Sequence, residues 1–144
     1  MKSEKELAAE AYILQLDELE EQIKLCREEY REAFEAASDI TSCARDGVSG
    51  GKGTVSRKIE NGAVRLASLA LEIDELTERY ELLRREIAGK LKALPRKERA
   101  VLHRIFILKM TNEATAEAVG MSAVNVWRIK KKGLENFAEK FLKM

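Results

Sequence analysis

The chain has 144 residues, of which 35% are charged and 45% are hydrophobic, with one proline and few aromatic residues. This length fits one domain, or a small domain with an extension, and the composition favours a helical, partly coiled-coil protein over a β-sheet protein. The charge is unevenly divided, because residues 1–94 contain 15 Lys/Arg and 20 Asp/Glu whereas residues 95–144 contain 11 and 5. An acidic segment followed by a basic one is typical of a scaffold joined to a surface that contacts a polyanion.

Several classes of protein are disfavoured by the same composition. No apolar run approaches about 18 residues, and the first residues lack the apolar core of a secretory signal, so we expect no membrane partner and a cytoplasmic location. Cys26 and Cys43 have no partnering histidine cluster, which indicates reduced thiols and neither a disulfide framework nor a metal site. His103 is the only histidine, and no paired carboxylates form a shielded site, so we expect no enzymatic activity and no cofactor.

Two heptad seams occupy the first ninety-odd residues. In each seam, apolar residues recur at alternating spacings of three and four with mostly charged residues between them, which predicts a long helix with one apolar stripe. The first seam consists of Tyr12, Leu16, Leu19, Ile23, Cys26, Tyr30, Ala33 and Ala37, and the second of Leu66, Leu69, Ile73, Leu76, Tyr80, Leu83 and Ile87. Between them, a Ser- and Gly-rich stretch of about residues 38–58 predicts a loop.

Two seams of similar length joined by a loop predict a long antiparallel coiled-coil hairpin over residues 1–94. The seams can instead pair with those of a second chain, and the sequence leaves both arrangements open. Because a two-helix hairpin buries only one stripe per helix, we expect a homodimer formed through these helices. The GGKGT run at residues 50–54 superficially resembles a phosphate-binding loop, but its spacing and the missing strand favour a linker.

Three shorter helices are predicted in residues 95–144. Pro95 is suited to the first position of the first helix, Thr111 is a capping residue before the second, and Gly120 ends the second. Ser122 then caps a third helix that continues almost to residue 144.

The spacing of four small or apolar residues in this segment, Ala116, Gly120, Val126 and Ile129, is that of a helix-turn-helix. A small residue in the first helix allows a close crossing, and a glycine in the turn adopts the left-handed conformation. The apolar residues of the second helix anchor its inner face and leave its outer face free. We therefore predict an all-α protein whose residues 95–144 form a DNA-binding domain.

Residues 94–137 resemble the promoter-reading fourth region of bacterial RNA polymerase sigma factors. The matching features are a Leu-Pro-x-x-x-Arg start, a Glu-x-x-Ala-x-x-x-Gly-x-Ser core, and a Val-x-x-Ile helix followed by Gly-Leu. The layout of the whole chain resembles small proteins of Gram-positive phages and prophages, similar to late-gene transcriptional regulators of the RinA and ArpU kind. The resemblance implies a sequence-specific DNA-binding transcriptional regulator. No motif for the other parts of a sigma factor is visible, so promoter melting is not implied.

In such modules the second helix enters the major groove of double-stranded DNA. The outward positions expected to read base edges are Ser122, Ala123, Val124, Asn125, Trp127 and Arg128. Asn125 suits adenine, Arg128 suits guanine, and Ala123 or Val124 suits a thymine methyl group. The phosphates are expected to contact Lys130, Lys131 and Lys132, which makes binding sensitive to salt.

The groove-facing positions of sigma factors are usually charged, whereas this chain has Ala123, Val124 and Trp127 there. We therefore expect a DNA target different from the sigma promoter element. Trp127 has two interpretations, since it either contacts DNA or packs against the preceding helix or a partner chain.

Two other functions stay open. A DNA-packaging protein similar to a phage terminase small subunit also joins a helix-turn-helix to coiled-coil helices, although there the DNA-binding module usually comes first. Alternatively, the basic module binds a protein, such as RNA polymerase. The sequence indicates neither the target DNA nor whether the effect is activation or repression.

Overall fold

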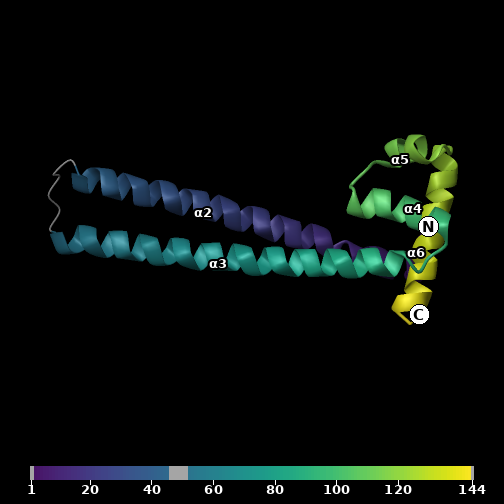
Figure 1. The fold of residues 1–144 in the computed structure, drawn as a ribbon, viewed down its shortest axis with the longest axis horizontal. Coiled ribbons are helices and arrows are strands. Elements are labelled where there is room, and N and C mark those ends of the chain that lie inside the picture. The colour runs from purple at the N-terminus through teal and green to yellow at the C-terminus, as the bar shows by residue number, and fades with distance from the viewer. Residues whose placement is uncertain (1, 46–51, 144) are drawn as a thin grey trace. The chain divides into compact units, whose positions relative to one another are not determined.

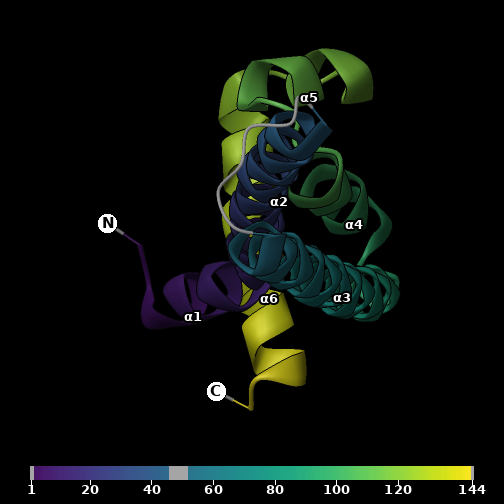
Figure 2. The ribbon, with the colours of Figure 1, turned by 90° about the vertical axis from the view of Figure 1, so that its left-hand side faces the viewer.

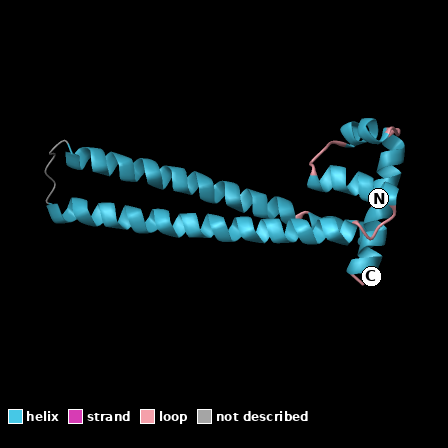
Figure 3. Cartoon of the chain, viewed as in Figure 1, coloured by secondary structure: helices cyan, strands magenta, loops and turns pink. Residues whose placement is uncertain are grey.

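The computed structural model describes residues 2–45 and 52–143, with the side chains of residues 40–45 and 52–55 excepted. Every regular element in this part of the chain is helical, which confirms the predicted all-α fold (Figure 3). The elements are α1 (Glu4–Ile13), α2 (Gln15–Arg45), α3 (Lys52–Leu91), α4 (Arg96–Leu102), the π-helical segment η1 (His103–Ile107), α5 (Asn112–Val119) and α6 (Ala123–Phe141).

The chain divides into two compact units. One unit, Leu19–Tyr80, consists of most of α2 and α3 and is called the hairpin unit here. The other, called the terminal unit, combines Met1–Glu18 with Glu81–Met144. The terminal unit therefore joins the two ends of the chain, which are far apart in the sequence.

In the hairpin unit, α2 and α3 run side by side in opposite directions (Figure 1). The hydroxyl of Tyr80 donates a hydrogen bond to Oε1 of Glu20 over 2.7 Å, and further along the pair Gly62 packs against Ala37. These contacts join an early residue of α2 to a late residue of α3, and a later residue of α2 to an earlier one of α3. The predicted long hairpin is confirmed.

The two seams form the contact between these helices. The buried core of the hairpin unit contains Ile23, Cys26 and Leu76, with Leu19, Ile73 and Tyr80 packed against it. Between residues 19 and 39, every seam position is buried or half-buried and every other residue is exposed. The seams thus pair within one chain.

Two helix boundaries differ from the sequence prediction. The helix expected to run through Tyr12 is divided at Leu14, because α1 packs on α6 while α2 follows the seam. The loop expected over residues 38–58 is wrong at both ends, since α2 continues to Arg45 and α3 begins at Lys52. Ser and Thr cost only about 0.5 kcal/mol each inside a helix, so they do not end a long helix by themselves. Residues 46–51, which include the first two glycines of GGKGT, lie outside the described residues.

Within the terminal unit, α6 is the central element, and α1, α4 and α5 all pack against it (Figure 2 shows α1 and α6). Leu134, Phe137 and Ala138 of α6 are fully buried. Gly133 permits a close crossing of α4, because a Cβ at this position would lie 2.9 Å from Cδ1 of Leu102. Residues 133 and 134, which end the sigma-like motif, lie inside α6, in agreement with the predicted long third helix.

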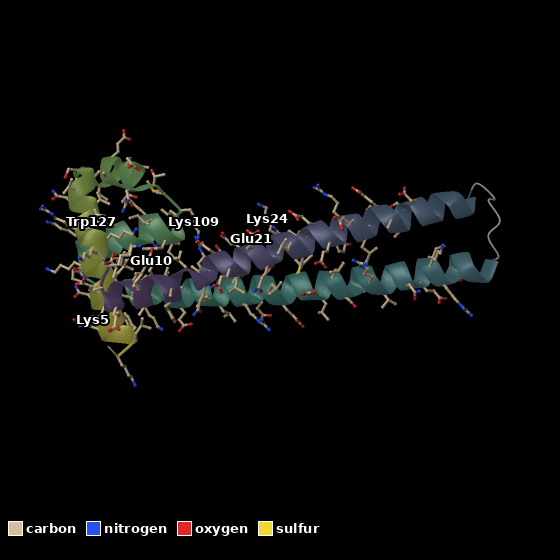
Figure 4. The ribbon with its side chains drawn as sticks, turned by 180° about the vertical axis from the view of Figure 1, so that it is seen from behind. Lys5, Glu10, Glu21, Lys24, Lys109 and Trp127 are labelled. Carbon is tan, nitrogen blue, oxygen red and sulfur yellow. The ribbon has the colours of Figure 1, made fainter. Side chains whose placement is uncertain are left out.

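The first helix is fastened to the second half of α6 by polar and aromatic contacts. They are Ser3 Oγ to Glu135 Oε1 at 3.1 Å, Lys5 Nζ to Glu139 Oε1 at 2.6 Å, and the rings of Tyr12 and Phe137 at 5.8 Å between centroids (Lys5 is labelled in Figure 4). These contacts leave the first half of α6 free of α1. Among the described residues, no helix is long and apolar enough to cross a membrane.

Candidate nucleic-acid interface

The turn between α5 and α6 has the backbone conformation that its sequence predicts. Gly120 has φ 69° and ψ 36°, the left-handed conformation that a residue without a Cβ adopts at little cost. The amide of Met121 donates to the carbonyl of Ala116 over 3.0 Å, and the amide of Gly120 donates to that of Glu117 over 3.4 Å. This pair of bonds is a Schellman motif, which satisfies the last carbonyls of α5 and sets the direction in which the chain leaves it.

Both helices of this pair begin with the predicted cap. Thr111 Oγ1 accepts a hydrogen bond from the amide of Ala114 over 3.1 Å, and Ser122 Oγ accepts one from the amide of Asn125 over 3.2 Å. Ser122 is therefore committed to its own helix through one oxygen lone pair. Its hydroxyl hydrogen is still available to an external acceptor.

A small apolar cluster holds α6 against the preceding helices. Its buried members are Val101, Ala116 and Val126, and Ile105, Val119, Met121 and Ile129 pack against them. Val126 and Ile129 thus anchor the inner side of α6, as their spacing predicts. The contact between Ala116 and this cluster shows why a small residue is needed inside α5.

The outer side of the first half of α6 is exposed to solvent. The six residues predicted to read bases, Ser122, Ala123, Val124, Asn125, Trp127 and Arg128, are all exposed. Val124 is 59% exposed and Trp127 is 53% exposed (Trp127 is labelled in Figure 4). The ring of Trp127 therefore does not pack into the core beneath α5.

The three lysines lie in different surroundings. Lys130 and Lys131 are both half-buried, whereas Lys132 is exposed, and the Nζ of Lys130 lies 5.5 Å from the ring centroid of Phe106. Lys131 has its Nζ 5.7 Å from the ring centroid of Trp127, so these two side chains form one cationic and aromatic pair. Lys130 lies one turn after the buried Val126, whereas Lys131 and Lys132 lie one turn after the exposed Trp127 and Arg128, on the outer side of α6.

The positive charge of the first half of α6 is not offset by acidic residues in the same stretch of sequence. Residues 121–134 contain one arginine and three lysines but no aspartate or glutamate. The ion pairs between described residues involve Lys2, Lys5, Lys90 and Lys109, and none of the four cations of this stretch. The first half of α6 therefore presents an uncompensated positive surface beside exposed apolar side chains.

Two polar side-chain pairs of the terminal unit could not be predicted from the sequence. Glu98 of α4 is buried, and both of its carboxylate oxygens accept from Nδ2 of Asn136 on α6, at 2.9 and 3.0 Å. Lys109, which has φ 58°, forms an ion pair with Asp17 at the start of α2 (Lys109 is labelled in Figure 4). Neither pair has a local sequence pattern, since the partners are 38 and 92 positions apart.

Comparisons with known proteins find no similar protein. No protein-family model matches the sequence, and neither curated proteins nor solved structures give a match.

Proposed function

We propose that this chain is a sequence-specific DNA-binding transcriptional regulator, of the phage or prophage late-gene kind that its sequence resembles. In this proposal α5, the turn at Gly120 and α6 act as a helix-turn-helix, and α6 enters the major groove. The observation that carries it is the division of α6 into two sides. In the first half of α6, one side is anchored by Val126 and Ile129, and the other is exposed, positively charged and free of acidic residues.

Each exposed residue has a role that follows from its chemistry. Asn125 pairs with both hydrogen-bonding positions of adenine, and Arg128 pairs with those of guanine. Val124 contacts a thymine methyl group, and Lys131 and Lys132 bind phosphates, which fix the register of the helix. Trp127 lies between Val124 and the two lysines in the sequence and contributes an apolar contact to the DNA.

The proposal is tested by selecting bound duplexes from a random pool with the full chain at about 0.15 M salt, near physiological ionic strength. We expect a preferred sequence to be enriched. Replacing Asn125 with alanine should relax the preference at one base pair and weaken binding by about 1–3 kcal/mol. Enrichment of no preferred sequence by the wild-type chain would exclude sequence-specific regulation.

The phosphate contacts are tested separately by the salt dependence of binding. K131Q/K132Q should reduce the slope of log K against log salt by roughly 2, because each lost phosphate contact contributes about 0.9. The control K24Q/R27Q removes two exposed cations from the hairpin unit and should leave the slope unchanged. An equal reduction in both variants would show only a general charge effect and would contradict the assignment to α6.

A second part of the proposal is that the protein acts as a homodimer through the hairpin unit. Because the two seams pack against each other within one chain, the dimer needs another apolar surface. Val64 and Leu71, which are 66% and 61% exposed, lie two turns apart on one side of α3 and supply it. A dimer of this kind would recognise two half-sites related by two-fold symmetry.

A further inference from the structure

A second basic surface of the terminal unit is formed by α4 and the segment η1. Arg96, Arg99, Ala100, His103 and Arg104 line a hollow of about 360 Å³. Because all five line the same hollow, they share one side of α4 and the start of η1. Four of the five side chains are basic.

The end of α3 extends this surface. Arg84 and Arg85 line a second hollow of about 330 Å³ together with Glu81, Ala88, His103 and Ile107. His103 borders both hollows and joins them. We call the combined surface, with Arg84, Arg85, Arg96, Arg99, His103 and Arg104, the arginine face.

The arginine face is not neutralised inside the protein. None of the ion pairs between described residues involves its five arginines, and Glu81 is the one carboxylate that lines the hollows. Burial, and then the charges of Arg84, Arg99 and Arg104, lower the pKa of His103. These like charges repel one another, and a bound anion would offset the repulsion.

This surface and the exposed side of α6 point in opposite directions. The side of α4 opposite to the arginines is buried, with Val101 in the apolar cluster that also holds Val126. Val126 in turn lies on the side of α6 opposite to its exposed residues. A straight duplex bound to α6 therefore does not reach the arginine face, which needs a different partner.

The chemistry of the surface indicates what that partner is. Guanidinium groups form paired hydrogen bonds with carboxylates, and arginine is enriched in protein interfaces. Between the arginines the hollows are lined by Ala88, Ala100 and Ile107, and Leu108, 52% exposed, directly follows η1. These apolar groups suit apolar side chains and offer nothing to a phosphate.

We propose that the arginine face docks an acidic protein segment in which apolar side chains alternate with carboxylates. This inference goes beyond DNA binding, since it gives the protein a second and independent partner surface. A regulator with both surfaces holds DNA on one side of the α4–α6 pair and an acidic protein on the other.

The test uses a fluorescein-labelled synthetic helical peptide that presents Glu and Leu at i, i+4 spacing, and the same peptide with Gln for every Glu. With the full chain at about 0.15 M salt, the Glu peptide should bind at least about tenfold more tightly than the Gln peptide, since charge-assisted pairs contribute about 1.5 kcal/mol or more. R96Q/R99Q should remove this advantage. The matched variant K131Q/K132Q should bind the Glu peptide as the wild type does.

The Glu peptide should also raise the pKa of His103 in the wild-type chain, because its carboxylates offset the charges of Arg84, Arg99 and Arg104. Nuclear magnetic resonance of the single histidine measures this without any substitution. An unchanged His103 pKa, equal binding of the two peptides, or equal losses in the two double variants would each overturn the proposal.

A loss of DNA affinity in R96Q/R99Q as large as in K131Q/K132Q would assign the surface to DNA instead. DNA binding that survives K131Q/K132Q unchanged would count against α6 as the DNA contact and leave the acidic-segment proposal intact.

Discussion

Two glycines of the terminal unit have opposite conformational roles, although neither has another atom near its missing side chain. An added Cβ meets nothing within 4 Å at Gly120 or at Gly89. Gly120 has a positive φ, whereas Gly89 lies inside α3. Replacing either glycine with alanine therefore changes the stability only through the backbone conformation at that position.

We expect Gly120→Ala to lower the free energy of unfolding by about 1 kcal/mol, because an L side chain is strained in the left-handed conformation. Gly89→Ala should raise it by roughly 0.5–1 kcal/mol, because alanine restricts the unfolded chain and favours helix. Urea unfolding of the two variants measures both changes. Changes of the same sign would show that Gly120 does not hold the left-handed conformation.

The charges around His103 lead to a pH dependence. Its pKa is lowered from 6.5 in the folded protein, by burial first and then by Arg84, Arg99 and Arg104. As the pH falls through about 6.5, the unfolded chain binds a proton at this residue and the folded chain does not. The free energy of unfolding should therefore decrease until the pH reaches the lowered value.

His103→Gln removes this contribution. We would measure urea unfolding of the wild type and of H103Q at pH 7.5 and pH 5.5. Because the carboxylates titrate in both proteins, the difference between the two gives the contribution of His103. We expect the wild type to lose more stability than H103Q on acidification. An equal loss in both proteins would mean that the pKa of His103 is not lowered in the folded protein.

At the scale of the element, the two valines of the first half of α6 distinguish its buried side from the side proposed to contact DNA. Val126 is fully buried and Val124 is exposed. Val126→Ala should lower the free energy of unfolding by roughly 2 kcal/mol, from lost burial and a cavity, and leave the DNA preference of the folded protein unchanged.

Val124→Ala should leave stability within about 0.5 kcal/mol and weaken binding to the selected DNA by about 1 kcal/mol, the contribution of one methyl contact. Urea unfolding and a binding titration of both variants give the four numbers. A loss of stability in V124A equal to that in V126A would show that the outer side of α6 is packed in solution.

The elements that the sequence could predict are those with local rules. A seven-residue repeat identifies both long helices and the side by which they pair, and cap residues and a turn glycine identify where α5 ends and α6 begins. The limits of the interhelical loop were wrong because composition alone does not say where packing stops supporting a helix.

The elements that sequence could not predict depend on contacts between distant parts of the chain. Nothing near Tyr12 indicates that its ring meets Phe137, or that α1 leaves the seam to pack on α6. The arginine face likewise joins the end of α3 to α4 and η1, so its separate arginines look like ordinary solvated charges in the sequence.

At the scale of the whole molecule, the proposed dimer needs an apolar surface other than the seams. Each seam is occupied by the other within the chain, and these pairings leave Val64 and Leu71 exposed on α3. These two side chains, two turns apart on one side of α3, form the centre of the proposed symmetric contact between two copies.

We therefore expect V64E/L71E to convert a dimer into a monomer, because four carboxylates would meet across the two-fold axis. Light scattering coupled to size exclusion measures the mass. The control L25E/F34E places the same charges at two exposed apolar positions of α2 and should stay dimeric. A dimer that survives V64E/L71E but not L25E/F34E would move the interface to α2. A wild-type mass of many subunits would instead favour a ring-forming DNA-packaging protein.

If the expected result holds, V64E/L71E should also bind a single half-site as well as the wild type but lose the added affinity for paired half-sites, since only the linkage between two copies of α6 has been removed.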